Sequence, residues 1–397
     1  MLNPALIAVP MRRDVHLLAV CLIGCGSAAN GQVLTEPLQE MSDKSAATRT
    51  EGGDQEKAKD ESEKSAKPDF LIVPIPISSP TLGHGLTLAG AVFYNPRGEP
   101  EPWISGVGLM RTSNGSRAIG AMHKMSLGQD RFRLMAFGGY ARINMNFYGI
   151  GPNAAKRDVS IELEEKGFAG LLQGQYRVAN HVYVGIRAEY LKLDTSVHND
   201  EPRFPELELP RPEFKSTLAA LGPVLTYDSQ NSSLTPTNGE YLGIAWMFGL
   251  PKLGSDFSYN KVNAQANIYR PLGRRTVIAG RAALCGVSDG APFYDLCMYG
   301  ASNDLRGYET GRYRDGATWA AQVELRQHLF WRLGAAVFAG VGGVAPKLGA
   351  LDDSVVLPSA GIGLRFQPSK ETPVNVRVDY ARGKDSHALY ISVGEAF

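Results

Sequence analysis

From Phe70 onward, apolar residues recur at every second position of the chain. Val262, Ala264, Ala266 and Ile268, for example, alternate with polar residues and a tyrosine. A period of two is typical of a β-strand that has one apolar and one polar face. We count about sixteen such segments of roughly ten residues, which is the length a strand needs to cross a membrane. No amphipathic helix lies between them to cover a sheet, so the pattern predicts an all-β chain.

A closed barrel whose exterior contacts lipid accommodates these strands best. In a bilayer every backbone polar group must be paired, and a closed barrel has no unpaired edge. The connection lengths agree with this fold, because the long segments 194–215 and 288–316 fall at one end, whereas turns such as 271–275 and 330–332 are short. We therefore predict a transmembrane antiparallel β-barrel of about sixteen strands over residues 69–397.

The N-terminal residues 1–31 have the features of a secretory signal peptide. Arg12 and Arg13 precede an apolar run that ends at Cys25, and small residues up to Ala29 follow. Two cleavage sites compete. An ordinary signal peptidase would cut near Ala29, whereas a lipobox ending at Cys25 would leave that residue lipidated.

Residues 32–68 are rich in Glu, Lys, Asp, Ser, Gly and Thr and contain almost no aromatic or branched residues. Such a segment cannot bury a core, so we predict a disordered periplasmic linker. The whole chain has a net charge of +1 with 20% charged residues, which excludes the basic footprint of a nucleic-acid-binding protein. Its 44 Gly, 16 Tyr and 15 Phe suit a barrel whose aromatic residues lie at the membrane interfaces.

The last predicted strand places Leu389, Ile391, Val393 and Phe397 on one face, and the chain stops at Phe397. A terminal aromatic residue on an alternating strand resembles the signal that the barrel-assembly machinery reads. We therefore expect the outer membrane of a Gram-negative bacterium, with that machinery as a partner for insertion. Outer-membrane lipids and lipopolysaccharide would surround the barrel.

The loop Gly300–Tyr308, with Leu305-Arg306-Gly307-Tyr308 at its tip, resembles the hallmark of the BamA/TamA barrel superfamily, also called the bacterial surface antigen family. In that family an Arg-Gly-aromatic tip on the sixth outer loop folds back into the lumen. Our strand count puts this loop between the eleventh and twelfth strands, as in the family. Further resemblances at 147–151, 222–239 and 378–383 extend over the whole barrel. The resemblance implies a long outer loop folded into the lumen.

Two features depart from the family pattern. Members that fold or translocate proteins usually carry periplasmic POTRA domains before the barrel, and here only the linker stands in that place. The thirteenth strand has Gly340 where many members have an Asp. The first difference argues against an insertase activity, and the second removes one expected partner of the loop arginine.

Arg306 would be a costly buried cation in the lumen unless it were paired. On the twelfth strand the alternation turns Glu324 inward, so Glu324 is the predicted acceptor, at which a guanidinium can bind in a bidentate geometry. Gly307 would let the backbone turn sharply, and Tyr308 would stack on the lumen wall. The alternative is an arginine exposed on an outer loop.

Pro74 and Pro76 are unusual in the first strand. Donors two residues apart point to the same neighbour, so both prolines remove hydrogen bonds on one side only. If that side faces the last strand, which ends at Phe397, the closing seam is weak and resembles the lateral gate of the family's insertases. The alternative is that residues 70–77 are a lead-in and that pairing begins later.

Two cysteines, Cys285 and Cys297, lie well beyond the signal region, and the sequence leaves open whether they form a disulfide or stay unpaired. The run Asp385-Ser386-His387 has the residue types of a hydrolase, but three consecutive residues cannot easily converge on one substrate atom. The histidines are scattered singly, without metal-ligand spacing. We therefore expect no enzyme, no metal and no cofactor.

Two function classes remain. The first is a BamA/TamA-like barrel that assists insertion or translocation of proteins or lipids at the outer membrane, together with a separate periplasmic partner. The second is a passive porin-like or structural surface antigen. The loop arginine and the prolines favour the first class, whereas the missing POTRA domains favour the second.

Overall fold

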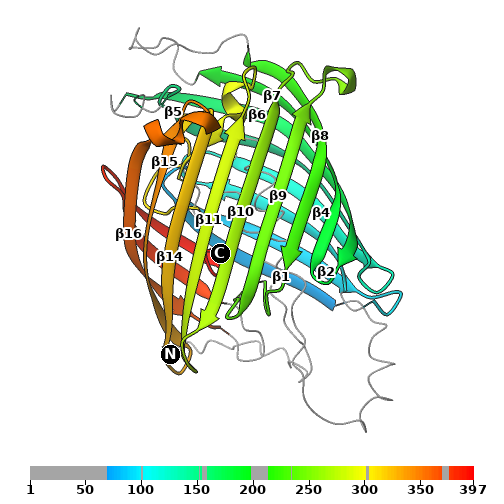
Figure 1. Ribbon diagram of the computed structural model, residues 1–397, viewed down its shortest axis with the longest axis vertical. Helices are drawn as coiled ribbons and strands as arrows, with labels where there is room; N and C mark the ends of the chain where they lie inside the picture. The colour runs from blue at the N-terminus through cyan, green and yellow to red at the C-terminus, as the bar shows by residue number, and fades with distance from the viewer. Residues whose placement is uncertain are drawn as a thin grey trace, which may run out of the picture.

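The computed structural model describes residues 69–99, 102–151, 153, 159–197, 213–233, 235–300, 304–368 and 375–397, and the predicted signal peptide and linker lie outside them. These residues form a closed antiparallel barrel of sixteen strands (Figure 1). The wall consists of β1 (Asp69–Ser79), β2 (Gly83–Tyr94), β3 (Trp103–Thr112), β4 (Arg117–Leu127), β5 (Phe132–Phe147), β6 (Ile161–Ala179), β7 (Val182–Val197), β8 (Lys215–Asp228), β9 (Gly239–Gly249), β10 (Asn260–Pro271), β11 (Thr276–Val287), β14 (Ala317–Phe330), β15 (Leu333–Ala345), β16 (Val355–Phe366), β17 (Val376–Arg382) and β18 (His387–Val393). The predicted fold class and strand number are confirmed.

Wall strands pair in chain order, β11 pairs with β14, and β18 pairs with β1 to close the barrel. The connection between β11 and β14 contains a small sheet of β12 (Cys297–Met298) and β13 (Arg314–Asp315). Short 3-10 turns occur at η3 (Pro251–Leu253), η4 (Phe293–Asp295) and η5 (Leu348–Asp353). Among the described residues, no helix has the length and apolar character needed to cross a bilayer.

The two faces of the wall follow the alternation in the sequence. On β14, the side chains of Val323 and Leu325 are exposed, whereas those of Glu324 and Arg326 are buried. An exposed apolar face is the surface that such a barrel presents to lipid, and the polar face turns inward. The predicted orientation of this strand is therefore confirmed.

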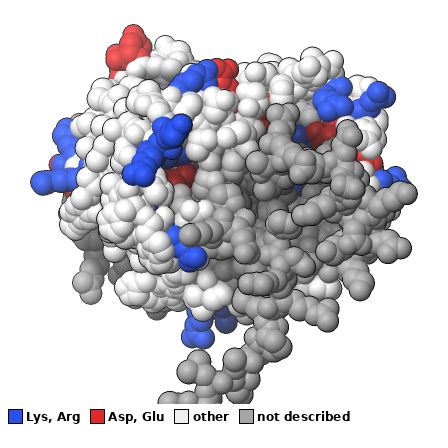
Figure 2. All heavy atoms as spheres, turned by 90° about the horizontal axis from the view of Figure 1, so that it is seen from below, with Lys and Arg blue, Asp and Glu red and all other residues white. Residues whose placement is uncertain are grey.

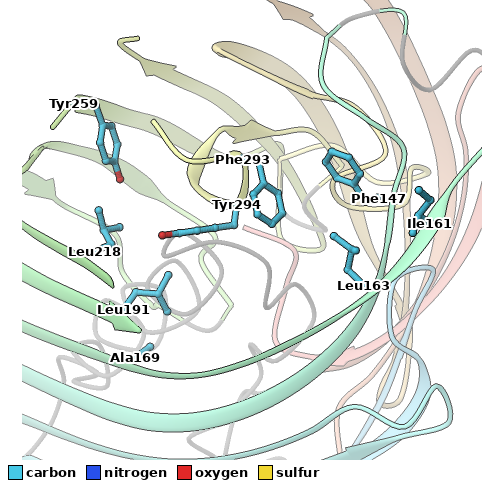
Figure 3. Close-up of a cluster of buried hydrophobic side chains, with 9 residues drawn as sticks. All are labelled: Phe147, Ile161, Leu163, Ala169, Leu191, Leu218, Tyr259, Phe293 and Tyr294. Carbon is cyan, nitrogen blue, oxygen red and sulfur yellow. The ribbon is translucent and has the colours of Figure 1, made fainter. Parts of the chain in front are cut away.

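Buried aromatic residues of the β11–β14 connection pack against the inner face of the wall. Phe293 and Tyr294, both in η4, form a cluster with Phe147 of β5, Leu163 of β6 and Leu218 of β8, among others (Figure 3). Phe293 meets Phe147 edge to face, with ring centroids 5.7 Å apart. The start of the connection is therefore held by apolar burial and aromatic packing.

The C-terminal residues depart from the predicted alternation. β18 ends at Val393, and Gly394 has a φ of 86°, a left-handed conformation that glycine adopts readily. The chain therefore turns out of the strand, and Phe397 is buried against Tyr269 of β10 instead of sharing the exposed face of Leu389. The prediction that Phe397 lies on that face, at the seam, is wrong because the period of two stops at Gly394.

Candidate functional site

Arg306 is fully buried and contacts two carboxylates from different wall strands. Its Nη2 lies 2.5 Å from Glu324 Oε2 on β14, and its Nη1 lies 2.6 Å from Asp379 Oδ2 on β17. Nη2 also donates to Gln322 Oε1 at 3.3 Å. The guanidinium thus joins β14 and β17, which are not neighbours in the barrel.

Further arginines surround the same carboxylates. Arg326 Nε lies 2.7 Å from Glu324 Oε1, and Arg365 Nη1 lies 2.5 Å from Asp379 Oδ1. Arg365 also places its Nε 2.7 Å from Glu395 Oε2, just beyond the end of β18. The arginine–carboxylate network comprises Arg306, Arg326, Arg365, Arg377, Glu324, Asp379 and Glu395.

All seven side chains of the network are buried, and its four arginines face three carboxylates. Burying charges is expensive, and their mutual attraction compensates only while each charge keeps its partners. Removing one member of such a buried set typically costs about 3–5 kcal/mol. The network therefore ties the loop tip to the wall in one defined position.

The position of Gly340 leaves room for the loop tip. A Cβ atom there would lie 2.4 Å from Cδ1 of Leu305, which is too close for two carbon atoms. The neighbouring Phe338 offers its ring to Arg306, whose Cζ lies 3.4 Å from the ring centroid. Gly340 supplies no carboxylate, as the sequence indicates. The second carboxylate that pairs with Arg306, beside that of Glu324, comes from Asp379 instead.

Sequence reasoning did not identify Asp379 as a partner of Arg306, although a signal was present. On β17 the exposed residues Val378 and Tyr380 flank Asp379, whose side chain is buried. The alternation therefore places Asp379 on the inner face. Only the closed barrel shows that it lies beside a residue 73 positions earlier in the chain.

Gly307 and Tyr308 attach the loop to the last hairpin. Gly307 has a φ of 108°, and its N–H donates to Tyr390 Oη at 3.0 Å. Tyr308 Oη donates to the carbonyl oxygen of Pro358 at 2.5 Å and accepts from the N–H of Lys384 at 2.9 Å. Burial raises the pKa of Tyr308 to about 12, so the phenol remains a protonated donor.

The run 385–387 is used to hold the loop. Ser386 Oγ donates to the carbonyl oxygen of Gly307 at 2.6 Å, and Ser359 Oγ donates to the carbonyl oxygen of Arg306. Neither hydroxyl is thus aimed at an open site. In the described part of the chain, no group of three or more His, Cys, Asp or Glu side chains is arranged to hold a metal ion.

A disulfide and an ion pair fix the first half of the connection. Cys285 of β11 is bonded to Cys297 of β12, with the Cα atoms 5.7 Å apart. Arg281 Nη2, from the inner face of β11, lies 2.7 Å from Asp304 Oδ1. The sequence left open whether the cysteines pair, and the structure contains the bond.

Glu309, which the sequence did not indicate, anchors the second half of the connection to β5. Tyr148 Oη donates to Glu309 Oε2 at 2.6 Å, and Asn146 Nδ2 donates to Oε1 at 3.1 Å. Burial raises the pKa of Glu309, and these two hydrogen bonds oppose the rise. The family-like stretch 147–151 therefore contributes a direct contact to the loop.

The closing interface between β1 and β18 is paired at one position, Ser78 opposite Ile391. Ser78 Oγ adds a hydrogen bond to the carbonyl oxygen of Leu389 at 3.2 Å. Pro74 and Pro76 are exposed and have no N–H to donate. The seam therefore has much less backbone pairing than the other described wall interfaces, which are paired over several consecutive residues.

On its other side, β1 pairs with β2 along its whole length, beginning at Asp69 opposite Phe93. Residues 70–77 are therefore part of the wall and not an unpaired lead-in. Towards β18, in contrast, pairing begins only at Ser78. The two sides of the same strand differ, and the prolines lie in the part that β18 does not pair.

A family model described as the Omp85 superfamily domain matches residues 87–397. Similar solved structures include CdiB from Escherichia coli (TM-score 0.56, 12% identity, covering 83% of this chain and 68% of that chain). BamA from Haemophilus ducreyi lacking POTRA domains 1–3 gives a TM-score of 0.54 at 18% identity, covering 82% and 70%. CdiB from Acinetobacter baumannii gives 0.54 at 10% identity, covering 89% and 70%. No curated protein matches. The structural likenesses concern the fold alone.

Proposed function

This chain belongs to the Omp85 superfamily, and from that membership we propose that it assists insertion or translocation of proteins or lipids at the outer membrane. Barrels of this family reside in the outer membrane and are transport or assembly proteins, not enzymes. The transport route that we propose is the seam between β1 and β18. A separate periplasmic partner would act with it.

The single observation that carries this proposal is the sparse pairing of the seam. A backbone hydrogen bond contributes about 0.5–1.5 kcal/mol net, so an interface paired at Ser78 and Ile391 alone costs little to separate. Pro74 and Pro76 cannot add donors. Every other described wall interface would lose several hydrogen bonds at once, so the barrel would open at the seam first.

The contacts of Arg306 support a further part of the proposal, a β11–β14 loop that is folded into the lumen. Its partners Glu324 and Asp379 are on the inner face of β14 and β17. Because the network also includes Glu395, it reaches the residues that follow β18. The network would keep the wall from β14 to β17 rigid while β18 separates from β1 at the seam.

A lock across the seam tests this function. We expect the pair S78C/I391C to form a disulfide, because these residues are opposite each other. The control is L88C/L109C, an opposed pair on the exposed face of β2 and β3. Cells that depend on the locked chain should show altered outer-membrane protein or lipid composition, which a reductant restores, whereas the control pair should have no effect.

Depletion of the protein is the complementary test. Outer-membrane protein and lipid composition should both be compared before and after depletion. A passive porin-like or structural barrel would leave both unchanged, and that result, or full function of the locked S78C/I391C chain, would contradict the proposal.

A further inference from the structure

The end of the barrel that carries the short turns contains an open cavity of about 290 Å³. Its walls come from the β8–β9, β10–β11 and β14–β15 connections and from residues on both sides of the β16–β17 connection. Figure 2 views the molecule from this end and shows Lys and Arg side chains at several places around it. The cavity shares only its inner wall, Arg326, Arg365 and Glu395, with the arginine–carboxylate network.

Five arginines and one carboxylate line this cavity. Arg326 and Arg365 lie on the inner wall and are already paired in the network. The rim arginines are Arg274 and Arg275, in the β10–β11 turn, and Arg332, in the β14–β15 turn. Among the described residues, no carboxylate forms an ion pair with any of the three. Within the described residues, the positive charge of the rim arginines is therefore not compensated by an ion pair.

Arg332 is held in place but remains incompletely satisfied. Its Nη1 donates to the carbonyl oxygen of Pro368 at 2.6 Å, which fixes the guanidinium at the rim. Its Nε is buried and has no acceptor within the described structure. A buried donor without a partner is costly, so an incoming acceptor oxygen would relieve this cost.

The same turns carry exposed aromatic side chains. Phe330 and Trp331 are each 65% exposed, and Trp331 packs on Phe366 with ring centroids 6.0 Å apart. Such residues form the girdle that lies at the level of the lipid headgroups in outer-membrane barrels. Arg332 follows directly, with its Cζ 5.4 Å from the Trp331 ring. Arg332 is therefore at the depth where phosphate groups occur.

We propose that this cavity binds a phosphate group, carried either by a phospholipid of the inner leaflet or by a soluble phosphate ester. Arginine presents two parallel N–H donors that match phosphate oxygens, and three rim arginines line this one cavity. The volume accommodates the phosphate together with part of the group that bears it. The inference depends on neither the seam nor the loop tip, so it stands or falls separately from the proposed function.

The test uses the full chain, purified in a zwitterionic detergent. The rim variant is R274Q/R275Q/R332Q, and the matched control is R111Q/R117Q/R382Q, which removes three exposed arginines at the opposite end of the barrel. Heat-modifiable migration verifies that each variant is folded. Phosphatidylglycerol and glycerol 3-phosphate are the two probes, with lipid retention followed by native mass spectrometry and soluble binding by calorimetry.

We expect the wild type and the control to bind one phosphate-bearing molecule per chain, and the rim variant to bind it about tenfold or more weakly. Saturable binding of glycerol 3-phosphate identifies a soluble ester as ligand, whereas binding of the lipid alone identifies the headgroup. Equal affinity of the rim variant and the control, or binding that does not saturate, would overturn the proposal. If the rim variant does not fold, R274Q/R275Q, which changes only exposed turn residues, replaces it, and unchanged affinity then has the same meaning.

Discussion

Arg306 and Asp379 are joined by an ion pair of 2.6 Å, although 73 residues separate them in the chain. Asp379 also accepts from Arg365 and Arg377, so it is the carboxylate on which the loop, β16 and β17 converge. The pair therefore connects the loop tip with the part of the wall nearest to β18. Removal of this ion pair should therefore affect both the loop tip and that part of the wall.

The first prediction concerns this pair. Substituting R306A or D379N should lower the free energy of unfolding by about 3–5 kcal/mol, because each leaves a buried charge without its partner. The double variant should lose less free energy of unfolding than the two single variants added together, and the difference, the coupling energy, should be about 0.5–3 kcal/mol. Thermal unfolding and limited proteolysis of the β11–β14 loop measure these effects. R117A, an exposed arginine, serves as the control, and additive effects of R306A and D379N would contradict the pairing.

The second prediction concerns the space that Gly383 leaves for Tyr308. A Cβ atom at Gly383 would lie 2.5 Å from Cζ of the Tyr308 ring. We expect G383A to reduce stability by about 1–3 kcal/mol, since overpacking displaces the ring and its hydrogen bond to Pro358.

In a Y308A background the same G383A change should cost much less, because the ring is absent. Thermal midpoints of the four proteins make up the test. An equal cost of G383A in both backgrounds would mean that Tyr308 does not occupy this position.

The third prediction concerns the disulfide between Cys285 and Cys297. The double variant C285S/C297S should lose about 2–4 kcal/mol, the usual contribution of such a bond to a chain of this kind. It should also make the β11–β14 connection more sensitive to proteases. Reduction of the wild type should reproduce the effect, and reductant should leave the double variant unchanged. A wild type that is insensitive to reductant would contradict this role.

The fourth prediction concerns Glu165 on β6, which is 2% exposed and has no hydrogen-bond partner for either carboxylate oxygen in the described structure. Because the cost of burying this carboxylate without hydrogen bonds exceeds its electrostatic attraction to the buried Arg314, E165Q should raise the free energy of unfolding by about 1–3 kcal/mol at neutral pH. The neighbouring Glu164 is paired with Lys166 at 2.5 Å, so E164Q should give no such gain. Chemical denaturation measures the free energy of unfolding of the wild type, E165Q and E164Q. A lower value for E165Q would contradict the prediction and show that the carboxylate stabilises the fold.

The sequence by itself determined the barrel and the orientation of its strands. Alternation is local: neighbouring side chains on a strand point to opposite faces, so Glu324 could be placed on the inner face from Val323 and Leu325 alone. The strand count then placed the loop of Arg306 between the eleventh and twelfth wall strands. These inferences needed only the period and the lengths of the connections.

The tertiary structure alone decided which inward side chains meet. Asp379 reaches Arg306 because the closed barrel brings β17 beside the loop, and a period of two does not tell which inward residues of distant strands meet. Phe397 turns inward because Gly394 ends the strand geometry, which the alternation could not reveal. The arginine-lined cavity likewise exists only because turns distant in the chain converge at one end of the barrel.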